Sequence, residues 1–225
     1  MMTQPSFKFA SIRLALRFNY VIFPLDQRDF FAGLRDIGFI IVKELPRNVP
    51  PGMTATVAGA IARVDGMVLD MDMDRQVIGL EGSSVELVIE KFGQVESLLS
   101  DRFGLDLGQN TMFYETIASF QLQTGREPIS TMSKLPGFER TIDCFGTVMG
   151  RTVTPLAIRM RLSESLPSDK EWFEITIEPF MINPKARYYV STIFRSPERN
   201  KVVDFTKQLQ TRVSEVVNSL ENLSQ

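Results

Sequence analysis

The feature that most constrains the fold is the stretch 65–103, where two strand patterns run into a helix pattern. In the first strand, apolar and acidic residues alternate: Leu69, Met71 and Met73 with Asp70, Asp72 and Asp74. A period of two indicates a strand with one buried and one solvated face. Over 85–103, apolar residues recur every three or four positions, which predicts an amphipathic helix. Ser83 and Glu86 are spaced as a capping box before it, and Gly104 is placed to end it.

The same order of elements is predicted a second time along the chain. Three pairs of features share one offset: the strands 12–23 and 111–123, the strands that open at Gly38-Phe39 and Gly137-Phe138, and the strands 53–63 and 152–163. The strand pair 172–179 and 186–194, then a helix starting at Ser196-Pro197, complete the second copy. Each half, 1–107 and 108–225, therefore holds a strand, a helix, four strands and a helix, and together the halves form one compact domain.

This order, given twice, resembles the TATA-binding-protein fold. The resemblance is one of topology and extends over nearly the whole chain. It implies an α+β fold in which a pseudo-twofold duplicated β-α-β-β-β-β-α unit builds one curved, mostly antiparallel sheet. The long helices would lie on one face of that sheet, the convex one, and the alternate strand residues would line the concave face.

The residues that this arrangement places on the concave face are charged ones of both signs: Arg13, Arg17, Asp70, Asp72, Asp74, Arg159, Arg161, Glu174 and Glu178. Duplex DNA carries a negative charge about every 1.7 Å of its axis, and its binders present cations there. The mixed face therefore disfavours duplex DNA as a partner. For Asp70, Asp72 and Asp74, the local role that we expect is pairing of opposite charges across strands with the arginines of this face.

The chain has no histidine and one cysteine, Cys144. These counts exclude Ser-His-Asp and Cys-His mechanisms, histidine-ligated metals and a structural zinc or iron–sulfur site. Carboxylates on one face of a strand lie roughly 6.5–7 Å apart, whereas Ca²⁺ takes oxygens at about 2.3–2.6 Å. We expect no metal, no cofactor and no internal disulfide, and we expect Cys144 to be a buried, inert thiol in a strand.

Other candidate sites have ordinary structural explanations. The segment 79–84 could hold a phosphate at a helix N-terminus, but it matches neither Gly-rich nucleotide-binding pattern. Glu174 and Glu178 lie roughly 13 Å apart along a strand, too far for a glycosidase pair unless the side chains converge. In the last helix, Val202, Leu209, Val216 and Leu223 repeat every seven residues. This spacing suits packing on the sheet, or alternatively a helix-mediated homodimer.

Composition defines the remaining expectations. The 225 residues carry a net charge of −2, with 44% hydrophobic and 23% charged side chains, as in ordinary globular proteins. No apolar run suits a membrane span, and the cysteine usage suits the cytoplasm. We expect a cytoplasmic, non-catalytic binding or protein-interaction module that uses the polar concave face. The alternatives are an enzyme that acts on a small anionic or phosphorylated molecule with carboxylates and arginines, and a nucleic-acid-binding protein.

Overall fold

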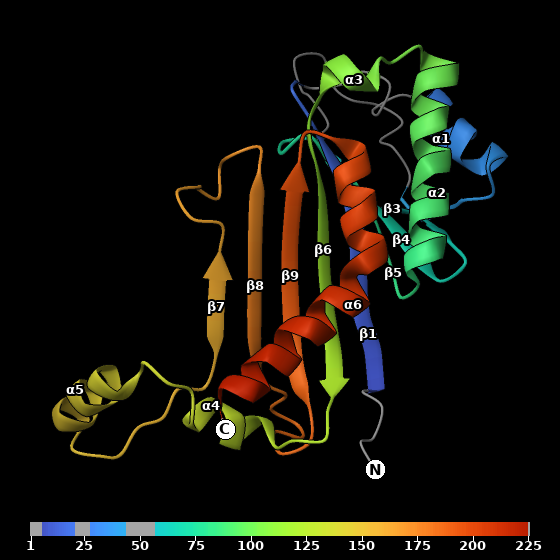
Figure 1. Ribbon diagram of the computed structural model, residues 1–225. Coiled ribbons are helices and arrows are strands. Elements are labelled where there is room, and N and C mark those ends of the chain that lie inside the picture. Colours follow the sequence, from blue (N-terminus) through green and yellow to red (C-terminus); the bar gives the residue numbers. More distant parts are fainter. Residues whose placement is uncertain (1–5, 21–27, 44–56, 225) are drawn as a thin grey trace.

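The computed structural model describes residues 6–20, 28–43 and 57–224 and places them in an α+β fold (Figure 1). Nine strands form one sheet: β1 (Ser6–Phe18), β2 (Ile40–Ile41), β3 (Ala58–Val64), β4 (Met67–Asp72), β5 (Val77–Gly82), β6 (Thr111–Gln123), β7 (Ile158–Arg161), β8 (Trp172–Pro179) and β9 (Tyr188–Ser196). Their order across the sheet is β2-β3-β4-β5-β1-β6-β9-β8-β7, and all neighbours are antiparallel. The sheet is open, with β2 and β7 at its edges.

The helices are α1 (Arg28–Asp36), α2 (Val85–Ser97), α3 (Leu107–Asn110), α4 (Pro128–Ser133), α5 (Glu139–Met149) and α6 (Arg199–Leu223). A π-helical turn, η2 (Leu98–Arg102), prolongs α2. Helix α2 packs on β1 and β5, α6 packs on β6 and β9, and the two helices contact each other. Figure 1 shows both of them in front of the sheet.

The core lies between the sheet and these two helices. Leu69 and Met71 of β4 are buried in one cluster with Val88 and Phe92 of α2, as their alternation predicts. Met73 follows the end of β4 and is partly buried against the same cluster. In the long central strand β1, the alternate apolar residues Ile12, Leu14, Leu16 and Phe18 are likewise buried. The apolar face of the sheet is therefore the face that the helices cover.

The start of α2 differs from its prediction by one residue. Strand β5 runs to Gly82, so the chain turns through Ser83 and the cap is Ser84. The Ser84 hydroxyl accepts the backbone N–H of Leu87 at 3.4 Å and itself donates to Glu86 at 3.2 Å. The capping box predicted from Ser83 and Glu86 therefore does not form. Gly104 has a φ of 63°, a left-handed conformation that suits the glycine predicted to end this helical stretch.

The largest error of the sequence-based prediction is at 137–144, which forms no strand. Residues Glu139–Met149 are helix α5, because Ile142, Phe145 and Met149 follow the helical period of three to four rather than the strand period of two. Gly150, with a φ of 62°, ends the helix. The strand predicted over 152–163 is also shorter, since β7 covers only Ile158–Arg161. Pro155 precedes it and has no N–H to give to a ladder.

The remaining differences are at element boundaries. β1 begins at Ser6, earlier than predicted. The parts of the predicted strands at 21–23 and 53–56 lie outside the described residues. β2 has only two residues, whereas β8 has the predicted bounds. β9 continues to Ser196, so α6 is capped by Glu198 instead of by Ser196. The Ser196 hydroxyl accepts the Glu198 N–H at 3.2 Å and shapes this turn.

Candidate functional site

The polar face of the sheet carries most of the residues that the sequence nominates for binding. Arg13 of β1 reaches across β5 to Asp70 of β4, with Nε–Oδ2 and Nη2–Oδ1 distances of 2.8 and 2.6 Å. Gly79 of β5 lies beneath the guanidinium, where an added Cβ would be 2.4 Å from its central carbon. Burial lowers the pKa of Arg13, but the hydrogen bond and charge of Asp70, together with the charges of Glu115 and Glu81, outweigh burial and raise it overall.

The other half of the face has the same kind of pairing. Arg195 of β9 donates to Glu115 of β6 at 2.5 and 2.9 Å, and its guanidinium lies 4.2 Å from the ring centroid of Phe113. Arg159 of β7 pairs with Glu174 of β8 at 2.7 Å. Of the nominated residues, Arg13 with Asp70 and Arg159 with Glu174 therefore form pairs of opposite charge across strands. Arg195 and Glu115 were missed by the sequence analysis, although their alternation along β9 and β6 gives the signal.

The other nominated residues do not converge with these pairs. Arg17 lies 5.8 Å from the Phe113 ring, and its buried Nε has no hydrogen-bond partner. Asp72 accepts the backbone N–H of Arg75 at 2.9 Å, and Asp74 is exposed in the turn after β4 instead of in the strand. Two more nominated residues lie toward the β7 edge of the sheet. Arg161 donates to the Ser165 carbonyl, and Glu178 lies opposite Tyr189. The structure therefore brings together two of the nominated pairs and leaves the rest dispersed.

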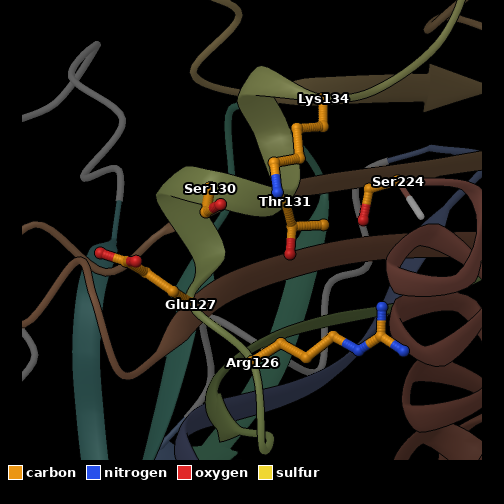
Figure 2. A pocket seen from close by; sticks show the side chains of 6 residues that line it. All are labelled: Arg126, Glu127, Ser130, Thr131, Lys134 and Ser224. Atoms are coloured by element: carbon orange, nitrogen blue, oxygen red, sulfur yellow. The ribbon is translucent and has the colours of Figure 1, made fainter.

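A polar pocket lies between α4 and the end of α6 (Figure 2). Its lining residues are Arg126, Glu127, Ser130, Thr131, Lys134 and Ser224. None of them was nominated by the sequence analysis, because they come from a loop, a short helix and the chain's far end. The pocket combines basic side chains with hydroxyl groups, a lining that suits an anion unless its basic groups are engaged elsewhere.

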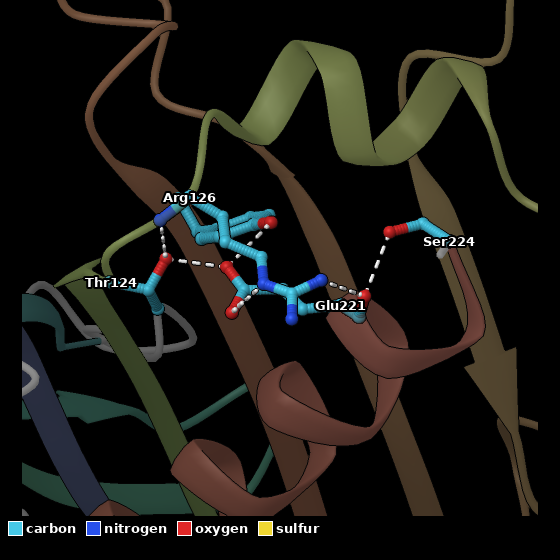
Figure 3. Close-up of polar contacts among 5 residues, drawn as sticks. Thr124, Arg126, Glu221 and Ser224 are labelled. Atoms are coloured by element: carbon cyan, nitrogen blue, oxygen red, sulfur yellow. Dashed lines mark hydrogen bonds and ion pairs between the residues drawn. The ribbon is translucent and has the colours of Figure 1, made fainter. Parts of the chain in front are cut away.

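Beside this pocket, the buried Glu221 of α6 organises a network of polar contacts (Figure 3). Its carboxylate accepts the Tyr188 hydroxyl at 3.1 Å and also the Thr124 hydroxyl. Arg126 donates to the Glu221 backbone carbonyl at 2.6 Å, and Ser224 donates to the same oxygen at 2.9 Å. Burial raises the pKa of Tyr188, and the charge of Glu221 raises it further. Because Arg126 is engaged here, the network serves to hold the end of α6 against β6 and β9.

On the helix side of the sheet, α6 and strands β7–β9 together line an apolar groove of about 660 Å³. Its lining includes Met160, Leu162, Phe173, Phe194, Leu220 and Leu223. Phe194 stacks on Phe205 of α6 with ring centroids 4.3 Å apart, and Phe173 meets the same ring edge-on at 6.0 Å. These three aromatic rings form part of the floor of the groove. Figure 1 shows β7 beside α6 and not behind it, so the apolar side of this edge is uncovered.

The groove leaves large apolar side chains in contact with solvent. Met160 is 60% exposed, Leu162 42% and Leu223 64%. The heptad repeat of α6 accounts for part of this: Val202 and Leu209 are buried against the sheet, whereas Val216 and Leu223 line the groove. The expectation that α6 packs on the sheet is therefore confirmed along the helix, because Val213 and Val217 of its second half are buried as well. One side of that second half borders the groove.

Helix α5 is a second exposed apolar element. None of its residues is buried, and Phe145, Val148 and Met149 are 60%, 78% and 64% exposed. In Figure 1 it stands away from the sheet, beyond the end of α6. Cys144 is exposed on it, contrary to the expectation of a buried thiol, because this segment is a projecting helix and not a strand of the sheet.

Comparison with known proteins gives no family for this chain: no family model and no curated protein matches it. Among the described residues, no helix is both long and apolar enough to cross a membrane. The same part of the chain holds no cluster of three or more histidine, cysteine or acidic side chains that could bind a metal ion. The groove and the polar sheet face are therefore the surfaces on which a function can be argued.

Proposed function

We propose that the protein is a non-catalytic interaction module that binds a protein partner by burying apolar surface. The observation that carries this proposal is the groove between α6 and β7–β9. Contiguous exposed apolar surface is uncommon on monomeric proteins and marks interaction sites. A groove bordered by a helix and floored by aromatic rings suits an amphipathic helix, which lays its apolar face into such a site.

The polar face supports the proposal less directly. Arg13, Arg159 and Arg195 each face a carboxylate at hydrogen-bond distance. A ligand anion would have to compete with these carboxylates, and a nucleic acid would meet alternating charges instead of a basic track. We therefore place the binding site on the helix side of the sheet, and we keep the polar face as the predicted second surface.

The fold that we propose is a TATA-binding-protein-like duplication with halves 1–107 and 108–225. The strand order supports it, because β2-β3-β4-β5-β1 on one side of the centre is mirrored by β7-β8-β9-β6 on the other. Each half also ends in a long helix, α2 or α6. The second half has one strand fewer because α5 replaces the strand predicted at 137–144.

This duplication gives a reason for the open groove. In the first half, α1 buries Phe30, Phe31 and Leu34, and its Gly33 lies against Leu98 at the end of α2. The corresponding helix of the second half, α4, has six residues where α1 has nine. The shorter helix leaves apolar surface uncovered beside the end of α6. A helix from another chain would fill a place of the kind that α1 fills in the first half.

Binding of a model helix tests the proposal. A fluorescent amphipathic peptide of leucine and lysine should bind saturably, as measured by anisotropy. The double variant Met160→Glu/Leu162→Glu should weaken it by about tenfold or more, because it places charges in the apolar site. The matched control is Met181→Glu/Ile182→Glu, which alters two exposed apolar residues in the β8–β9 loop and should bind as the unmodified chain does. Equal binding by the groove variant would overturn the proposal.

A further inference from the structure

We infer that the partner in the groove is helix α5 of a second copy of this chain, exchanged reciprocally in a homodimer. The inference rests on the proposed function, since it names the occupant of the same groove. The chain presents two unpartnered apolar surfaces, one a groove and the other a helix of the kind that fits a groove. Exposed apolar surface is favourable to bury, and these two surfaces are complementary in form.

The sequence of α5 suits docking by one face. Ile142, Phe145 and Met149 are spaced by three and four residues, with Val148 beside them, and so they form one stripe along the helix. Arg140 and Asp143 lie on the opposite side, and Glu139 lies on the flank of the stripe. Nothing in the described part of the chain buries the stripe, so its exposure has no explanation within one copy.

The rim of the groove matches the polar side of this helix. Arg212 and Glu215 of α6 flank the apolar floor, and they present both signs of charge to whatever lies there. Arg212 is held in place by Gln208, one turn earlier, at 2.8 and 3.1 Å. A docked α5 brings Glu139, which flanks the stripe, near this rim, where Arg212 carries the opposite charge. Rim charges of this kind favour one orientation of the helix.

The second copy is favoured over the chain's own α5 because the start of α5 is fixed. Leu135 is buried, and Phe138, the residue directly before the helix, packs against the core. From that anchor the helix extends away from the sheet (Figure 1). To reach its own groove, α5 would have to turn about residue 138, whereas docking on another copy requires no change of direction. A twofold arrangement satisfies both helices and both grooves at once.

Light scattering over a concentration series tests the dimer. The unmodified chain should be dimeric, and Phe145→Glu on α5 or Met160→Glu on β7 should each weaken the dimer by about tenfold or more. Ile182→Glu, another exposed apolar position, is the matched control and should leave the dimer intact. Circular dichroism should show all four proteins folded. A chain that is monomeric at every concentration, or a dimer that both variants leave unchanged, would overturn the inference.

Mixing the two monomeric variants identifies the surfaces that meet. The Phe145→Glu chain keeps an intact groove and the Met160→Glu chain keeps an intact α5, so a mixture should form dimers that neither variant forms alone. Pairing of α5 with α5, or of groove with groove, gives no such recovery and would overturn the inference. Peptide binding separates this result from the proposed function, because the groove of the Phe145→Glu chain should bind the model peptide more tightly once α5 no longer competes.

The single cysteine provides an independent readout. Cys144 borders the apolar stripe of α5, and Ser219 lines the groove on α6. In a Ser219→Cys variant, mild oxidation should link two chains, as seen on a non-reducing gel. The additional variant Ser219→Cys/Cys144→Ser, mixed with unmodified chain, should give the linked heterodimer. A disulfide formed within one chain would place α5 in its own groove and overturn the homodimer while leaving the groove as the binding site.

Discussion

Gly79 lies beneath the guanidinium of Arg13 and lets a charge on β1 reach a carboxylate two strands away. Substitution by alanine places a Cβ 2.4 Å from the guanidinium carbon, so Arg13 must move away from Asp70. Both partners are partly buried, and we expect Gly79→Ala to lower the free energy of unfolding by about 1–2 kcal/mol. Urea unfolding measures this loss.

A double-mutant cycle shows whether that loss acts through the ion pair. Arg13→Met removes the guanidinium that the new methyl group would displace. In the Arg13→Met background, Gly79→Ala should therefore cost less than it does in the unmodified chain. Additive losses would mean that the alanine acts on the strand itself and not on the pair.

The raised pKa of Tyr188 predicts a loss of stability at alkaline pH. Burial and then the charge of Glu221 raise its pKa above the ordinary 10.0, so the folded state keeps a proton that the unfolded chain releases. The contribution is fully present below about pH 10 and is lost as the pH rises through the folded-state value, because the folded state then binds more protons than the unfolded state. The free energy of unfolding should fall accordingly.

Urea unfolding between about pH 9 and 11 checks this prediction. Tyr188→Phe should reduce the slope of the fall, and Tyr189→Phe, its neighbour in β9, should not. Some slope should remain in Tyr188→Phe, because burial also raises the pKa of Tyr114. An identical slope in Tyr188→Phe and the unmodified chain would contradict the assignment.

At the residue scale, the sequence predicts which charged side chains share a face of the sheet better than it predicts which residue each of them contacts. Alternation correctly indicates that Arg13, Asp70, Arg159 and Glu174 share a polar face with charges of both signs. It cannot indicate that Arg13 meets Asp70 across an intervening strand, because that contact depends on the register of three strands and on the absence of a side chain at Gly79. Glu221 and Tyr188 are 33 residues apart in sequence, and only the folded chain brings them together.

At the element scale, the predictions succeed where the periodic pattern of apolar residues extends over many residues and fail where it covers only a few. The stripes of α2 and α6 repeat over several turns and are correctly predicted as helices. The run 137–144 holds too few apolar residues to separate a period of two from one of three to four. Phe145 and Met149, just beyond the end of that run, carry the helical spacing. The absence of the strand predicted at 137–144 follows from this helical spacing.

Two changes at the element scale should have effects of very different size on the free energy of unfolding. Replacing Glu139–Met149 by a flexible linker should change the free energy of unfolding by less than about 1 kcal/mol, because no residue of α5 is buried. Ending the chain before Asn218 removes Leu220 and the buried Glu221, and leaves the Tyr188 hydroxyl without its acceptor. This truncation should cost about 3 kcal/mol or more.

Thermal and urea unfolding of the two proteins provide the comparison. Dimeric chains must be compared at one protein concentration, since association adds to apparent stability. The Phe145→Glu variant is the matched reference for the linker protein, because both lack the docking face of α5 and both should be monomeric. A large loss in the linker protein relative to Phe145→Glu would show that α5 supports the fold of a single copy.

At the scale of the whole molecule, the two halves meet along β1 and β6 and again where α2 touches α6. The order of elements predicted from sequence describes this arrangement well for the first half and less well for the second. The reason is physical: α1 buries apolar side chains in the first half, whereas the projecting α5 forms in the second half where a strand was predicted.

The junction of α2 and α6 contains an ion pair between Arg199 and Glu96. Glu96 near the end of α2 is buried, and Arg199 at the start of α6 donates to its carboxylate at 2.6, 2.7 and 2.8 Å. The hydrogen bond from Arg199 to Glu96 raises the pKa of the guanidinium. Removing one partner of a buried pair leaves an uncompensated charge, which costs far more than the pair contributes.

Arg199→Met should therefore lower the free energy of unfolding by about 2–4 kcal/mol, as it leaves Glu96 buried and charged. Glu96→Gln/Arg199→Met should recover part of that loss, because the carboxylate is then gone. The matched control is Arg102→Met, whose partner Asp36 is 2.5 Å away and exposed, and which should cost less than about 1 kcal/mol. Urea unfolding measures all three, and similar losses for Arg199→Met and Arg102→Met would show that the halves are held together by the β1–β6 pairing and not by this junction.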